Sequence, residues 1–172
     1  MIRQEIYIEP LRWHVTVFYS VTHYDVEEIT ARLVQIGCEG ENLSRAIENL
    51  SAADLNTGLC YSSRGASVLV IGCASSAKQF ANSLSHEQHH LASQIASTLG
   101  WDLLGESVCY LAGNIAAQMY PIAKNVTEYV LPEDASGWKL EPESKLARFS
   151  FVVHDGVLYA RVAGKSLTIC VR

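Results

Sequence analysis

Two histidines and a glutamate in S-L-S-H-E-Q-H-H-L-A, residues 83–92, have the spacing of a metal site with a base beside it. His86 and His90 are four residues apart, so on a helix their imidazoles lie one turn apart on one face and can aim at one point. Glu87 could take a proton from a water bound to that metal. The pattern predicts one zinc ion per chain, with Glu87 as general base.

The helix that must carry these residues is marked by its neighbours. No Pro or Gly occurs from Ser76 to Leu99, and Gly100 closes the stretch. At 100° per residue, His86 and His90 point away from the apolar stripe. This orientation argues against histidines buried in a core, and it leaves a solvated polar face as the alternative to a metal site. The apolar stripe is Phe80, Leu84, Leu91, Ile95 and Leu99.

A second helix, predicted over 106–123, offers a candidate third ligand. Glu106 stands at its first turn, where a carboxylate also suits the helix dipole. Small residues on the same face would let the two helices approach closely. The alternative is that Glu106 is an ordinary acid of a helix N-terminus. Tyr110 is a candidate donor to a developing oxyanion, with a structural tyrosine as the alternative.

Turn signals and hydrophobic periodicity divide the rest of the chain. The β-branched run 67–73 is predicted to be a strand, either a core strand or an edge that could align an extended peptide. Asp155-Gly156 predicts a tight turn within a hairpin over 149–162. The other predicted elements are a strand over 12–21, helices over 26–37 and 41–50, a loop or hairpin over 56–65, a linker over 125–148 and a third C-terminal strand over 166–171.

Composition narrows the classes of function. The 172 residues carry a formal net charge of −5, and no cluster of Lys and Arg is present. We therefore expect neither nucleic-acid binding nor attachment to an anionic membrane. No apolar run reaches the length of a membrane span, and the N-terminus does not resemble a signal peptide. The five cysteines contain no C-x-x-C pair, so reduced thiols in a cytoplasmic protein are expected.

Several stretches resemble known metallopeptidases. The order of a strand, a His-Glu-x-x-His helix and a Glu on the next helix resembles the gluzincins. More closely, the chain resembles a group of small His-Glu-x-x-His proteins of gut-bacterial and phage genomes. The stretches that carry this resemblance are D-x-x-x-G-x-x-Y-S (54–62), S-V-L-V-I-G (67–72), S-A-K-Q-F-A-N-S-L-S-H-E-Q-H-H-L (76–91) and G-E-S-V-C-Y-L-A-G-N-I (105–115).

The resemblance covers residues 12–122 and implies a ligand set of His86, His90 and Glu106, with Glu87 as base. It implies no particular substrate. Several gluzincins have an acidic residue four positions after the ligand Glu, and in this chain that position is Tyr110.

Together these observations predict an α+β fold. A small, mostly antiparallel sheet would pack on a zincin-like pair of metal-binding helices within residues 1–124. Residues 125–172 would form a linker and a C-terminal β-meander. The predicted function is a zinc-dependent peptidase that acts on a peptide or protein substrate. Two alternatives remain: a non-catalytic phage or mobile-element protein that binds other proteins and has a structural or vestigial metal site, and an interaction module without metal.

Overall fold

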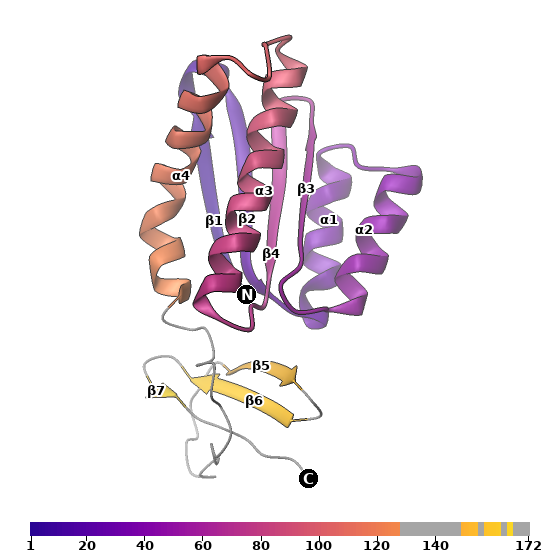
Figure 1. Ribbon diagram of the computed structural model, residues 1–172. Coiled ribbons are helices and arrows are strands. Elements are labelled where there is room, and N and C mark those ends of the chain that lie inside the picture. Colours follow the sequence, from indigo (N-terminus) through magenta and orange to yellow (C-terminus); the bar gives the residue numbers. More distant parts are fainter. Residues whose placement is uncertain (128–148, 155–156, 163–164, 167–172) are drawn as a thin grey trace. The chain divides into compact units, whose positions relative to one another are not determined.

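The computed structural model describes residues 1–127, 149–154, 157–162 and 165–166 (Figure 1). The chain divides into two compact units, residues 1–130 and 131–172. The first unit contains a four-stranded sheet and four α-helices, so the predicted α+β class is confirmed. All candidate functional residues lie in this first unit.

The sheet of the first unit is mixed. Its strands are β1 (Ile2–Ile8), β2 (Trp13–Val21), β3 (Gly58–Ser63) and β4 (Ala66–Gly72), in the order β1-β2-β4-β3. β2 and β4 run parallel, and the other two pairings are antiparallel. β1 was not predicted from the sequence. The idea that the run 67–73 forms a sheet edge is wrong, because β4 lies between β2 and β3, and β3 is the edge strand.

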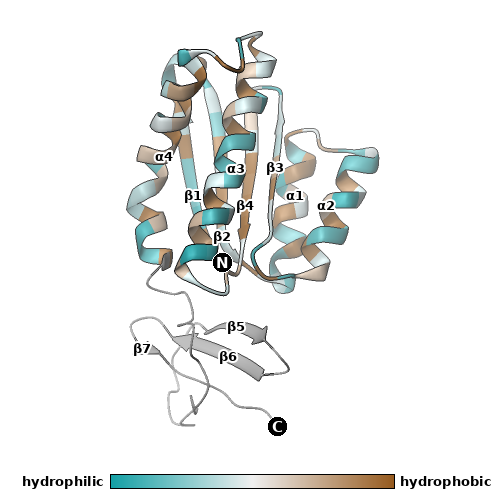
Figure 2. Cartoon of the chain, viewed as in Figure 1, coloured by the Kyte–Doolittle hydropathy of each residue, from teal (hydrophilic) through white to brown (hydrophobic). Residues whose placement is uncertain are grey.

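Helices cover both faces of this sheet (Figures 1 and 2). α1 (Val26–Gln35) and α2 (Gly40–Ala52) pack on one face, and α3 (Ala77–Thr98) and α4 (Glu106–Thr127) pack on the other. The sequence predicted a single pair of helices on the sheet. A second pair is needed because β4 is apolar on both faces: Leu69 and Ile71 belong to the core under α3, whereas Val68 and Val70 belong to the core under α1.

A two-residue turn sets the register of β3 on β4. Arg64 and Gly65 both have positive φ, 52° and 78°, as a type I′ turn requires. Ser63 and Ala66 flank the turn as a pair, and such flanking residues exchange backbone hydrogen bonds. Bonded pairs then recur at every second residue. The backbone N–H and C=O groups of Gly58, Cys60 and Ser62 therefore point to the open edge of the sheet.

Clear start and stop signals bound α3. The Ser76 side chain accepts a hydrogen bond from the backbone N–H of Gln79 (3.2 Å), which caps the first turn. Gly100, with φ of 69°, follows the last turn. α4 begins at Glu106 as predicted and continues through Pro121 to Thr127, four residues beyond the expected end. No helix in the described part of the chain combines the length and apolar character needed to cross a membrane.

The second unit contains a three-stranded sheet in the order β5-β6-β7. β5 (Phe149–His154) and β6 (Val157–Val162) pair antiparallel, which confirms the predicted hairpin. The predicted Asp155-Gly156 turn lies outside the described residues, as do most of the linker and most of the predicted strand 166–171. β7 is described over Lys165–Ser166.

Truncation of a buried leucine of α3 tests this packing. Leu91 is fully buried between α3 and the sheet, so Leu91→Ala should lower the free energy of unfolding by about 2–5 kcal/mol. Leu104→Ala is the matched control, because that side chain is 94% exposed and should contribute almost nothing. Urea unfolding of both variants measures the difference, and equal losses would contradict the packing described above.

Candidate functional site

The two histidines of the His-Glu-x-x-His stretch converge on one point above α3. Their Nε2 atoms are 3.0 Å apart, and both side chains lie on the solvent side of the helix. Two nitrogens bound to one tetrahedral zinc at about 2.0–2.1 Å would be about 3.3 Å apart. A zinc ion therefore fits between His86 and His90 after a shift of a few tenths of an ångström. The predicted orientation away from the apolar stripe is confirmed.

Glu87 turns the other way, towards the edge strand, and is 6% exposed. Its side chain lies directly over Gly58, the first residue of β3. A Cβ atom at Gly58 would be only 2.5 Å from Glu87 Cγ and 2.7 Å from Oε1. These distances are far below any van der Waals contact, so Glu87 occupies this position because residue 58 has no side chain.

Burial changes the protonation of Glu87. Removal from water raises the pKa of its carboxyl group above the ordinary 4.5, and the nearby His86 opposes the shift. Glu87 Oε1 lies 4.0 Å from His86 Nε2. A carboxyl group with a raised pKa next to a possible metal ligand has the properties of a general base that must also return a proton.

Two side chains of α3 hold the helix against β3 and the residues before it. Ser83 Oγ donates to the carbonyl of Asn56 (2.9 Å), and Gln94 Nε2 donates to the carbonyl of Cys60 (3.3 Å). Cys60 Sγ lies 3.6 Å from Gln94 Oε1. Burial, together with the charge of Glu87, raises the pKa of Cys60 to about 12. Glu87 lies between these two attachments, so its position is fixed from both sides.

A polar hollow of about 380 Å³ opens beside His86 and Glu87. It lies between α3, the end of α2 and the segment that leads into β3. Asn56 fixes that segment: its backbone N–H donates to the carbonyl of Cys73, and its Oδ1 accepts from the backbone N–H of Ser75. The residues that line the hollow are Asn49, Ala52, Asp54, Asn56, Thr57, Gly58, Asn82, Ser83, His86 and Glu87.

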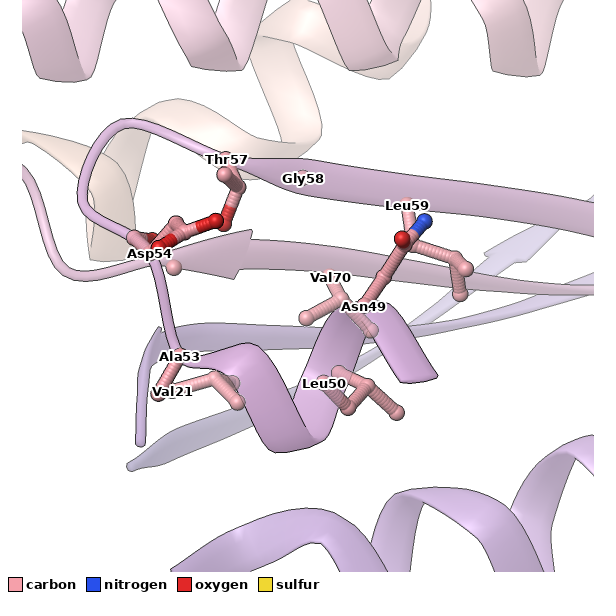
Figure 3. A pocket seen from close by; sticks show the side chains of 10 residues that line it. Val21, Asn49, Leu50, Ala53, Asp54, Thr57, Gly58, Leu59 and Val70 are labelled. Atoms are coloured by element: carbon pink, nitrogen blue, oxygen red, sulfur yellow. The ribbon is translucent and has the colours of Figure 1, made fainter. Parts of the chain in front are cut away.

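A second, smaller hollow of about 20 Å³ lies between α2 and the sheet (Figure 3). Its walls are mainly apolar, with Val21, Leu50 and Val70 among them, and it has room for about one water or methyl group. Gly58 and Asp54 border both hollows. The start of β3 is therefore open on two sides, and the polar hollow is the one that reaches His86 and Glu87.

The predicted third ligand does not lie near the histidines. Gln88 Nε2 donates to Met119 Sδ (3.3 Å), which fixes the register of the antiparallel pair α3 and α4. Glu106 precedes Met119 by 13 residues and so lies level with about residue 101, beyond the end of α3. At 1.5 Å per residue that level is about 16 Å along the axis from His90. In the described part of the chain, no three His, Cys, Asp or Glu side chains gather as metal ligands.

Tyr110 lies on the same outer part of α4. Its side chain is 76% exposed, so it is not the buried structural tyrosine considered as the alternative. The register of the helix pair places it level with the last turn of α3, away from Glu87. His89 is also exposed, on the α3 face that bears His86 and His90.

Sequence reasoning missed the residues that surround Glu87. Gly58 lies within the predicted loop or hairpin over 56–65 and within the stretch D-x-x-x-G-x-x-Y-S, but no spacing links it to Glu87. Asn82 lies one helical turn before His86, on the same face of the predicted helix, but no spacing links Asp54 and Asn56 to the histidines. Their proximity depends on the pairing of β3 with β4 and on the packing of α3, which bring residues about 30 positions apart together.

Comparisons with known proteins do not identify a relative. No protein-family model, curated protein or solved structure matches the chain. The resemblance to gluzincins stays a prediction, and the function must be argued from the residues and their geometry.

A side chain added at Gly58 should displace Glu87. Gly58 does not have a left-handed backbone, so Gly58→Ala should fold, but its methyl group must push the carboxylate out of the buried position. We expect the pKa of Glu87, measured by ¹³C NMR of the carboxyl carbon, to fall towards the ordinary value. Gly113→Ala is the control, since nothing lies within 4 Å of a Cβ there. An unchanged pKa in Gly58→Ala would contradict the close approach.

The raised pKa of Glu87 also predicts a pH dependence of stability in the metal-free protein. The folded state keeps the Glu87 proton at pH values where the unfolded state has lost it, so this group destabilises the fold as pH rises past 4.5. Glu87→Gln removes that penalty. The variant should therefore gain stability over the parent between pH 5 and pH 7, measured by urea unfolding. Glu48→Gln, at an exposed position of α2, should show the same pH dependence of the free energy of unfolding as the parent.

Proposed function

We propose that this protein is a metal-dependent peptide hydrolase. His86 and His90 would hold one zinc ion, and Glu87 would act as general base. The observation that carries the proposal is the arrangement on α3: two imidazole nitrogens 3.0 Å apart, and next to them a buried carboxyl group of raised pKa. A zinc ion there would lower the pKa of a bound water and polarise a carbonyl group.

The neighbouring edge strand supports a peptide as the substrate. The backbone groups of Gly58 and Ser62 point to the open edge of β3. An extended chain can add to such an edge by backbone hydrogen bonds. The Cys60 carbonyl is already bonded to Gln94 (3.3 Å), so pairing would be strongest near Gly58. A peptide aligned there would have its backbone next to Glu87 and the histidine pair.

Glu87 would move one proton twice. It would accept a proton from the attacking water as the new C–O bond forms, and it would then deliver that proton to the leaving nitrogen as the C–N bond breaks. A carboxyl group with an ordinary pKa would be a poor donor at neutral pH. Burial over Gly58 shifts the Glu87 pKa in the direction that both steps need.

Two histidines alone form an incomplete zinc site, because catalytic zinc has three protein ligands. Glu106 remains the sequence-based candidate for the third. It would have to approach by about 16 Å along α3, which requires a rearrangement of the start of α4. Tyr110 as an oxyanion donor would need the same movement. The zinc affinity of Glu106→Gln tests whether Glu106 is the third ligand. The affinity should equal that of the parent if Glu106 stays at the position seen in the structure.

Two other functions remain as alternatives. One is a binding protein of a phage or mobile element that keeps the metal only for structure. The other is an interaction module without metal. The burial of Glu87 favours the hydrolase, because a structural zinc site has no need for an acid of raised pKa beside its ligands.

The test is hydrolysis of a peptide library by the full chain with one equivalent of zinc, compared with Glu87→Gln. Loss of the general base should lower kcat by about 10²–10⁴-fold while zinc binding, measured in parallel, is kept. His89→Gln is the matched control, since that histidine is exposed on the same helix and has no proposed role. Hydrolysis that survives in Glu87→Gln, or no hydrolysis in the zinc-bound parent, would contradict the proposal.

A further inference from the structure

The polar hollow next to Glu87 is built from hydrogen-bonding side chains. Asparagines from α2, α3 and the segment before β3 contribute to its lining, together with Asp54, Ser83 and Thr57. Among the described residues that line it there is no Lys or Arg, and Ala52 contributes the single apolar side chain. Its volume of about 380 Å³ lies within the range of small-ligand sites.

Part of this lining is occupied by internal bonds, and part is free to bind a ligand. Thr57 Oγ1 donates to the carbonyl of Asp54 (2.8 Å), and Ser83 Oγ donates to the carbonyl of Asn56 (2.9 Å). By contrast, the Asp54 carboxylate and the side-chain amides of Asn49 and Asn82 have no hydrogen-bond or ionic partner among the described residues. The free groups thus include one full negative charge and two amide oxygens that can accept.

We infer that this hollow binds the cationic side chain of a substrate, a lysine or an arginine. Such side chains carry only donors, which match the Asp54 carboxylate and the amide oxygens of Asn49 and Asn82. An acidic side chain would meet the Asp54 carboxylate and would be repelled by it. The net charge of −5 on the whole chain acts in the same direction.

The hollow includes His86 and Glu87 in its wall. If these residues hydrolyse a peptide bond, as proposed, a side chain held in the hollow belongs to a residue beside that bond, and the hollow determines substrate specificity. Asp54 is then a specificity-determining residue. It takes no part in the proton transfers, and its removal should change which peptides bind without changing the base.

The experiment is an NMR titration of the ¹⁵N-labelled full chain with four blocked single amino acids: the N-acetyl methylamides of lysine, norleucine, glutamine and glutamate. Norleucine has the length of lysine without the charge. We expect the lysine probe to bind about three- to fivefold more tightly than norleucine, as for one partly exposed ion pair. We expect glutamate to bind least. Amide signals of Asn49, Thr57 and Asn82 should shift.

Three variants make the result specific. Asp54→Asn should bring the lysine and norleucine affinities within about twofold. Glu48→Gln removes the same charge from α2 outside the hollow and should change nothing. Asn82→Lys, at an exposed position of α3, should abolish lysine binding and improve glutamate binding, and it tests the inference should Asp54→Asn fail to fold.

Equal affinity for lysine and norleucine, shifts elsewhere on the protein, or equal effects of Asp54→Asn and Glu48→Gln would overturn the inference. These outcomes are separate from those of the hydrolase proposal. A chain that hydrolyses peptides without preferring basic residues refutes only the inference. A chain that binds lysine in the hollow and hydrolyses nothing refutes only the hydrolase.

Discussion

The packing of α3 against the edge strand β3 is the constraint on which the rest of the candidate site depends. Gly58 has no side chain, and the Glu87 side chain fills the space that a Cβ atom would need. A Cβ atom there would be only 2.5 Å from Glu87 Cγ. The carboxyl group is thereby buried, and its pKa is raised. Because Glu87 turns towards the strand, the neighbouring histidines turn towards solvent. The absence of a side chain at Gly58 therefore allows Glu87 to be buried, while His86 and His90 on the same helix stay exposed.

The sheet supplies the second half of this arrangement. A type I′ turn at Arg64 and Gly65 folds β3 back on β4, and the resulting register points every second backbone group of β3 at the open edge. Behind that edge, both faces of β4 are buried under the two helix pairs. Glu87 on α3 and the open edge of β3 are therefore held side by side by the same core.

Local signals were sufficient to predict much of this from the sequence. The bounds of α3 followed from Ser76, Gly100 and the lack of Pro and Gly between them, and the outward face of His86 followed from helical periodicity. The strand β1 was missed because its apolar residues are interrupted by charges. The edge position of β3 and the contact of Gly58 with Glu87 depend on strand order and tertiary packing, which spacing does not encode. Glu106 is a similar case. Its residue type and its place at a helix start suggested a metal ligand, whereas the register of α3 and α4 places it beyond the end of α3, away from the histidines.

The central claim is that His86 and His90 bind a metal. The most direct test is the zinc content of the purified full chain by mass spectrometry, with and without added zinc, beside the double variant His86→Ala/His90→Ala. About one zinc per parent chain and none in the variant is the expected result. A parent that binds no zinc even after incubation with the ion would contradict the claim, and the two histidines would then be a polar face of α3.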